Sequence, residues 1–190
     1  MRFAAILFTT LAVAGCGASS GGGAAPDRSA KAVLLAEKLA AENISEPATL
    51  PTTGSARYEG FMTARLPLGP ESRRVDYLGD LYLDVDFAAD QNQLSGSASG
   101  FAHNDNRLEG ALSITGGDLF RETDPDKNYT FTGEIDGTLS RGASDFVVDA
   151  DLTGEFRGRN QDGVSGIVYG DITGPQGQDI FDGSFSAEKK

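Results

Sequence analysis

The sequence is poor in the residues that form covalent cross-links and most metal sites. Its 190 residues include one cysteine, one histidine and no tryptophan. A single cysteine excludes an intramolecular disulfide and a metal site built from several thiolates. The histidine, His103, stands in the turn-like stretch FAHNDNRL. We interpret it as a solvated turn residue and not as a metal ligand or a general base.

Basic residues are also scarce, with 16 lysines and arginines against 28 acidic residues and a net charge of −12. This charge argues against nucleic acid as a partner, because phosphate backbones would be repelled. The stretch 124–128, DPDKN, imitates the start of a calcium loop, but Tyr129 stands where glycine is required. Neighbouring carboxylates such as Asp84 and Asp86 fit the solvated face of a strand and not an acid–base pair. We therefore expect no metal, no cofactor and no enzymatic activity.

The single cysteine follows an apolar run at the start of the chain. Arg2 precedes the apolar stretch 3–13, which is too short to span a bilayer. The order LAVAGC resembles the lipobox of bacterial lipoproteins. This resemblance implies that residues 1–15 are a signal peptide and that Cys16 carries acyl chains, which anchor the protein to a membrane. The alternative is an ordinary signal peptide with an incidental cysteine.

The expected location is the bacterial cell envelope. Gly17 stands where an aspartate would favour retention at the inner membrane of enterobacteria, so we expect anchoring at the outer membrane. Residues 16–26 are rich in glycine, serine and alanine and are predicted to form a flexible tether. Residues 27–44 are predicted to form a short helix that packs or acts as a spacer, with a partner-binding helix as the alternative.

From residue 56 onward, apolar and polar residues alternate with a period of two, which is typical of strands with one dry face. The stretch YLGDLYLDVDF shows the pattern most clearly, since its apolar residues and its aspartates occupy opposite phases. Turn residues separate eight such runs, which lie at about 56–66, 74–88, 92–103, 106–115, 128–140, 144–158, 163–173 and 178–188.

Glycines share the phase of the apolar residues in most of these runs. Inward glycines allow strong curvature or a close approach of large side chains, which a narrow closed sheet requires. The connections are short, so the sequence predicts an all-β fold, an eight-stranded antiparallel up-and-down β-barrel over residues 48–190. Its outward face carries many carboxylates, which would be costly against lipid. We therefore expect a soluble, monomeric barrel filled by its own side chains.

Four stretches of the barrel region resemble the barrel domain of transferrin-binding protein B-like lipoproteins. They read LPTTGSARYEGF, LDVDFAADQNQLSGSASGF, LTGEFRGRNQDGVSGIVYGDI and FDGSFSAEK. The resemblance covers residues 48–190 and implies an eight-stranded barrel on a lipid-anchored chain. It also implies binding of a protein or of an iron- or haem-related partner. The family pattern has a tyrosine where Arg157 stands here, and no partner-contacting residue can be carried across.

Two connections are the candidate partner-binding loops. The first, 66–74, contains Arg73 and Arg74, and the second, 116–128, is the longest connection and contains Leu119 and Phe120. An exposed aromatic residue would anchor a partner, whereas a buried one would plug the barrel end. The alternative is that both loops are solvated connections.

The sequence thus predicts a non-enzymatic binding module on the cell envelope, with a protein or an outer-membrane receptor as partner. Two alternatives remain open. One is a small-ligand carrier with a lipocalin-like cavity, and the other is a structural envelope lipoprotein.

Overall fold

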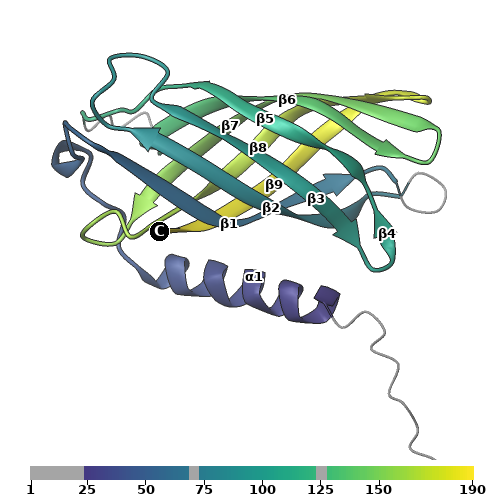
Figure 1. Cartoon of the computed structure of the whole chain (residues 1–190), viewed down its shortest axis with the longest axis horizontal. Coiled ribbons are helices and arrows are strands. Elements are labelled where there is room, and N and C mark those ends of the chain that lie inside the picture. The colour runs from purple at the N-terminus through teal and green to yellow at the C-terminus, as the bar shows by residue number, and fades with distance from the viewer. Residues whose placement is uncertain (1–23, 69–72, 123–127) are drawn as a thin grey trace, which may run out of the picture.

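The computed structural model describes residues 24–68, 73–122 and 128–190. In these ranges the chain forms one closed antiparallel sheet with one helix on its outside (Figure 1). The elements are α1 (Ala24–Ala41), the 3-10 helix η1 (Pro47–Thr49), β1 (Ser55–Leu66), β2 (Val75–Asp86), β3 (Leu94–His103), β4 (Asn106–Arg107), β5 (Glu109–Gly117), β6 (Phe131–Arg141), β7 (Ser144–Arg157), β8 (Gly163–Gly174) and β9 (Gly177–Lys189).

The predicted eight-stranded up-and-down barrel is confirmed. Neighbouring strands in the sequence pair with each other, and β1 pairs with β9 to close the sheet. The two-residue β4 is the start of the fourth predicted run and pairs with the end of β3. Leu108, which is buried, separates β4 from β5. β4 and β5 together therefore form the fourth of the eight barrel strands.

The interior is filled by the apolar side chains of the predicted inward phase. Phe156 is fully buried, and its ring centroid lies 5.1 Å from that of Phe131 and 6.0 Å from that of Tyr58. Phe87 adds a further ring at 5.9 Å. Such offset and tilted ring pairs are favourable in a dry core. The aromatic cluster occupies the space that a lipocalin-like cavity would need.

Inward glycines make room for these rings. A Cβ atom built on Gly154 would lie 2.4 Å from the ring of Phe131, and one built on Gly79 would lie 2.7 Å from the ring of Phe101. Both distances are shorter than any real carbon contact. The glycines in phase with the apolar residues therefore serve close packing inside a narrow barrel.

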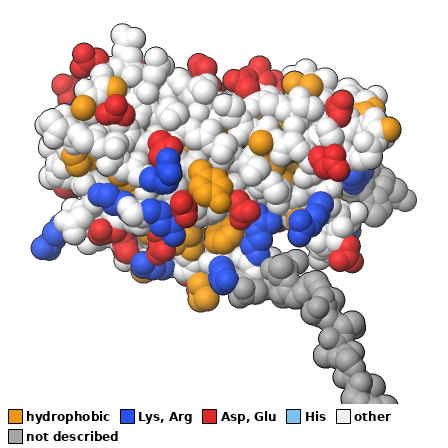
Figure 2. Space-filling view, viewed as in Figure 1, with side chains coloured by type: hydrophobic (Ala, Val, Ile, Leu, Met, Phe, Trp, Pro, Cys, Tyr) orange, Lys and Arg blue, Asp and Glu red, His pale blue; other side chains and the backbone are white. Residues whose placement is uncertain are grey.

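Helix α1 lies along the outside of the barrel against β8, β9 and β1. Among residues 28–41 of the helix, Leu39 is the one fully buried side chain, and it sits over Gly163, where a Cβ atom would be 2.3 Å from it. Arg28 forms an ion pair with Asp80 at 2.8 Å. Figure 2 shows charged side chains of both signs around hydrophobic ones on this face. The helix thus packs on the barrel wall.

The helix begins and ends earlier than the predicted range 27–44. Residues 24–26, which the sequence assigned to the tether, belong to its first turn. It stops before Ile44, which forms an isolated bridge with Arg157, and the Ser45 N–H donates to the Phe156 carbonyl at 2.9 Å. In the described ranges, we find no helix with the length and apolar character needed to cross a bilayer.

Candidate binding site at one end of the barrel

The up-and-down topology places successive connections alternately at the two ends of the barrel. The connections 67–74, 104–105, 142–143 and 175–176 meet at one end, which we call the recessed end. The connections 87–93, 118–130 and 158–162 meet at the other, together with the segment 42–54, and we call this the covered end. In Figure 1 the recessed end lies to the right. The two candidate loops of the sequence therefore lie at opposite ends and cannot form one surface.

The loop with Leu119 and Phe120 helps to close the covered end. Leu119 is buried in the core, and its N–H donates to the side-chain oxygen of Gln93 at 3.1 Å. Phe120 is half-buried and packs edge-on against Tyr129, with ring centroids 5.5 Å apart. Arg121 ties the loop to neighbouring segments by donating to two backbone carbonyls, those of Leu50 and Phe87, each at 2.9 Å. Leu119 is thus a plug and not an exposed anchor.

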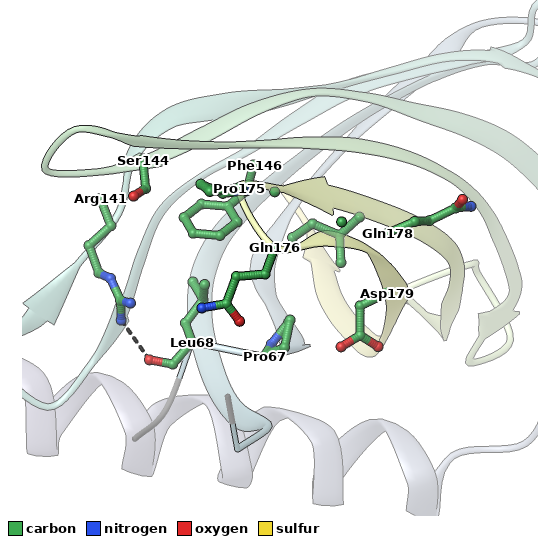
Figure 3. A pocket seen from close by; sticks show the side chains of 12 residues that line it. Pro67, Leu68, Arg141, Ser144, Phe146, Pro175, Gln176, Gln178 and Asp179 are labelled. Atoms are coloured by element: carbon green, nitrogen blue, oxygen red, sulfur yellow. Dashed lines mark hydrogen bonds between the residues drawn. The ribbon is translucent and has the colours of Figure 1, made fainter. Parts of the chain in front are cut away.

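The recessed end contains an open recess of about 430 Å³. It is framed by the end of β1, the β6–β7 hairpin and the β8–β9 hairpin (Figure 3). Its apolar lining consists of Pro67, Leu68, Phe146, Ile172 and Pro175. Gln176 extends from the β8–β9 turn across its middle in Figure 3. A volume above roughly 300 Å³ is enough for a small organic ligand.

Arg141 provides the positive charge at the rim of this recess. It is the last residue of β6, and its Nη1 donates to the Leu68 carbonyl at 2.6 Å. This bond uses one of its five N–H groups. The rim also contains Asp179, but that carboxylate is paired with Arg74 at 3.2 Å. The recess therefore combines a mixed polar and apolar lining with a guanidinium that forms no ion pair with a described residue.

A second recess of about 480 Å³ adjoins the first and shares Leu68 and Arg141 with it. Arg73 and His103 also line it, and no described carboxylate does. The sequence placed His103 in a solvated turn, whereas the structure places it at the end of β3. Its ring lies 5.7 Å from that of Tyr77, and its Nδ1 bonds to the Asp76 carbonyl at 2.8 Å. Because a carbonyl only accepts, Nδ1 is the donor in this bond.

The two predicted arginines have different surroundings. Arg74 is half-buried and pairs with Asp179 and Asp182, and it also donates to the Arg65 carbonyl at 3.1 Å. Arg74 joins the β1–β2 connection to β9, and most of its N–H groups already have acceptors. Arg73 is exposed and lines the second recess. Of the two, Arg73 has the geometry of a ligand-contacting residue.

Sequence reasoning missed Arg141 and the recess below it. Phe146 lies on the inward face of β7, where it is 8% exposed. Antiparallel pairing of β7 and β8 places the start of β7 beside the β8–β9 turn, but the position of the β1 end and of Arg141 around that turn depends on how the barrel closes. The one available signal was Arg141 itself, a cation at a tight hairpin of a strongly acidic chain.

Two other predictions fall outside the part of the chain that the structure describes. Cys16 and the whole of 1–23 lie there, as do four residues of the stretch DPDKN, 124–127. Within the described ranges, no three His, Cys, Asp or Glu side chains lie close enough together to hold a metal ion. No family model matches the sequence, and no curated protein matches it either.

Proposed function

We propose that this chain is a lipid-anchored protein of the bacterial cell envelope that acts as a non-enzymatic binding module of the transferrin-binding-protein type. The observation that carries the proposal is the difference between the two barrel ends. The covered end is closed by Leu119 and Arg121, whereas the recessed end offers two recesses with Arg73 and Arg141 at their rims. The partner, a protein or an iron- or haem-related compound, binds at the recessed end.

The membrane anchor fits this arrangement. Arg28, near the start of α1, contacts Asp80 and the Gly100 carbonyl, which lie toward the recessed end of β2 and β3. Lys38, near the end of α1, pairs with Glu188 toward the covered end. The N-terminal end of α1 therefore points toward the recessed end (Figure 1). A partner within an outer-membrane receptor or close to the bilayer is in reach of that end.

The two recesses favour the small-ligand alternative, whereas the filled core argues against a ligand inside the barrel. The fully buried rings of Phe156 and its neighbours leave the barrel interior occupied. A small ligand would therefore bind in the rim recess of about 430 Å³ and not inside the barrel. A purely structural envelope protein would need neither recess.

Fractionation of cells that express the Cys16→Ser variant tests the anchor. The wild-type chain is expected in the membrane fraction, and the variant in a soluble or unprocessed form, because serine cannot carry the thioether-linked lipid. A processed variant that stays in the membrane fraction would contradict the lipoprotein assignment.

Capture of a partner by the full chain tests the binding role. Arg73→Glu with Arg141→Glu reverses the charge of the recessed end, and partner capture should be lost. Arg159→Glu with Lys189→Glu, at exposed residues of the covered end, changes the charge equally and should capture normally. Equal capture by both variants would place the partner elsewhere.

A further inference from the structure

We propose that the recess below Arg141 binds a small amphipathic anion, an apolar chain or ring that carries a carboxylate or phosphate group. The proposal rests on the proposed function in taking the recessed end as the binding end. It goes further by naming the chemistry of the ligand. Pro67 and Pro175, with the small exposed edges of Phe146 and Leu68, form the surface for the apolar part, and Arg141 is positioned for the acidic head.

The distribution of arginine partners supports an anion. Acidic residues outnumber basic ones by 28 to 16, so carboxylates are in excess over the whole surface. Five described arginines form ion pairs with carboxylates: Arg28, Arg57, Arg65, Arg74 and Arg157. Arg73, Arg107, Arg121, Arg141 and Arg159 form none with a described residue, and of these Arg73 and Arg141 line the two recesses of the recessed end. A guanidinium that forms no ion pair within the protein and lines a recess is suited to bind the carboxylate of a ligand.

The lining of the recess supports an apolar body beside that anion. Phe146 is almost fully buried, and a Cβ atom at Gly174 would lie 2.6 Å from its ring. Glycine at this position therefore lets the backbone of the β8–β9 hairpin pack against the ring, and a small edge of Phe146 still lines the recess. Pro175 and Pro67 extend the apolar surface, so a ligand chain or ring would lie between the two hairpins (Figure 3). An anion without an apolar part would leave this surface unused.

The position of the recess allows two sources for such a ligand. Seven residues, 17–23, lie between Cys16 and the start of α1, and these eight steps along the chain span at most about 28 Å at full extension. With the α1 N-terminus directed toward the recessed end, a lipid-anchored chain holds the recess near the bilayer. The ligand is then a membrane-derived lipid acid or a water-soluble organic acid, and both share the chemistry that Arg141 recognises.

Calorimetric titration of the full chain in phosphatidylcholine nanodiscs tests the proposal, with empty nanodiscs as the blank. The probe is 4-phenylbutyrate, and 4-phenyl-1-butanol is its neutral counterpart. We expect saturable binding of the acid and at least tenfold weaker binding of the alcohol. Arg141→Gln should weaken binding of the acid about tenfold or more, because it removes a charged hydrogen-bonding pair. Ser144→Phe, which fills the recess and keeps Arg141, should abolish binding.

Arg159→Gln is the charge-matched control and should bind the probe like the wild type, since Arg159 lies at the covered end. Circular dichroism shows whether each variant is folded. Displacement of the probe by lysophosphatidate, or by soluble acids alone, distinguishes the two sources. Absence of saturable binding, or binding that neither Arg141→Gln nor Ser144→Phe weakens, overturns the proposal. Neither result bears on the membrane anchor, which the Cys16→Ser fractionation tests separately.

Discussion

Phe156 occupies the centre of the aromatic cluster inside the barrel, in contact with rings from three other segments. Its side chain is fully buried, and Phe131 is its nearest ring neighbour. Phe156→Ala would leave a cavity that surrounding strands cannot close. We expect a loss of about 3–5 kcal/mol in the free energy of unfolding, measured by chemical denaturation.

Asp151 lies on the same strand and faces outward, so Asp151→Ala is the matched control. Its effect should stay within about 0.5 kcal/mol. Equal losses for the two variants would show that the inward and outward faces of β7 are assigned incorrectly.

Tyr58 gives the barrel a pH-dependent component of stability. Its hydroxyl donates to the Gln161 carbonyl at 3.0 Å, and burial raises the pKa of this phenol, with a smaller contribution from the Asp162 carboxylate. The unfolded chain loses the phenol proton above about pH 10, while the folded chain keeps it. The contribution of Tyr58 is therefore complete below about pH 10 and declines as the pH rises beyond it.

Tyr58→Phe should cost about 1 kcal/mol at neutral pH, through the lost hydrogen bond. The difference from wild type should shrink above about pH 10, because only the wild type loses stability through this group. Denaturation curves between pH 7 and 11 measure it, and Tyr82→Phe at an exposed site is the control. A stability difference between wild type and Tyr58→Phe that stays constant from pH 7 to 11 would contradict a raised pKa of Tyr58 in the folded chain.

At the scale of elements, α1 is held to the barrel by few buried contacts. Leu39 is its one fully buried side chain in the range described, and Lys38 pairs with Glu188 at 2.5 Å on the surface. That hydrogen bond raises the pKa of the Lys38 ammonium, but exposed pairs contribute little to stability. We predict that Leu39→Ala releases the helix and leaves the barrel folded.

Hydrogen exchange tests this prediction. In the Leu39→Ala variant, the α1 amides should exchange much faster, while amides of β6 and β7 keep their protection. Val33→Ala, at an exposed position of the same helix, should leave both unchanged. Faster exchange throughout the barrel would instead make α1 part of its cooperative core.

The strands could be predicted from the sequence and the helix ends could not, for a physical reason. Each strand buries one face, so a period of two appears in the sequence over ten or more residues, as in β2 and β7. The end of α1 depends on a tertiary contact, the bridge between Ile44 and Arg157. Glu42 favours a further helical residue and Asn43 and Ile44 oppose it only weakly, so a bridge to a residue more than a hundred positions away decides where the helix ends.

At the scale of the whole molecule, the order of the strands determines which candidate loops can lie at the same end of the barrel. The connections with Arg73 and Leu119 are separated by three barrel strands, which is an odd number. In an up-and-down barrel, two connections separated by an odd number of strands lie at opposite ends. The predicted strand order was therefore enough to separate the two candidate loops. The recess below Arg141 was not available in the same way, because three separate segments contribute to it. Its shape depends on how far each hairpin extends beyond the barrel.

The acidic wall of the barrel provides the last prediction. Asp149 on β7 lies directly opposite Asp136 on β6 and Asp171 on β8, and all three are exposed. Like charges at directly opposed positions destabilise a sheet by a few tenths to about 1 kcal/mol per pair. Added salt screens this repulsion, since the Debye length falls from about 30 Å at 0.01 M to about 3 Å at 1 M. The wild-type chain should therefore become more stable as sodium chloride is added.

Asp149→Lys converts both repulsive pairs into attractive ones and should raise the free energy of unfolding by about 1 kcal/mol at low salt. This gain should shrink at high salt, because the new attractions are screened as well. Asp90→Lys, in an exposed turn, changes the net charge equally without a carboxylate placed opposite it in the sheet. Denaturation of both variants at two salt concentrations separates the local effect from the effect of total charge. If Asp90→Lys stabilised the barrel as much as Asp149→Lys, the net charge of −12 and not the row of carboxylates would be responsible.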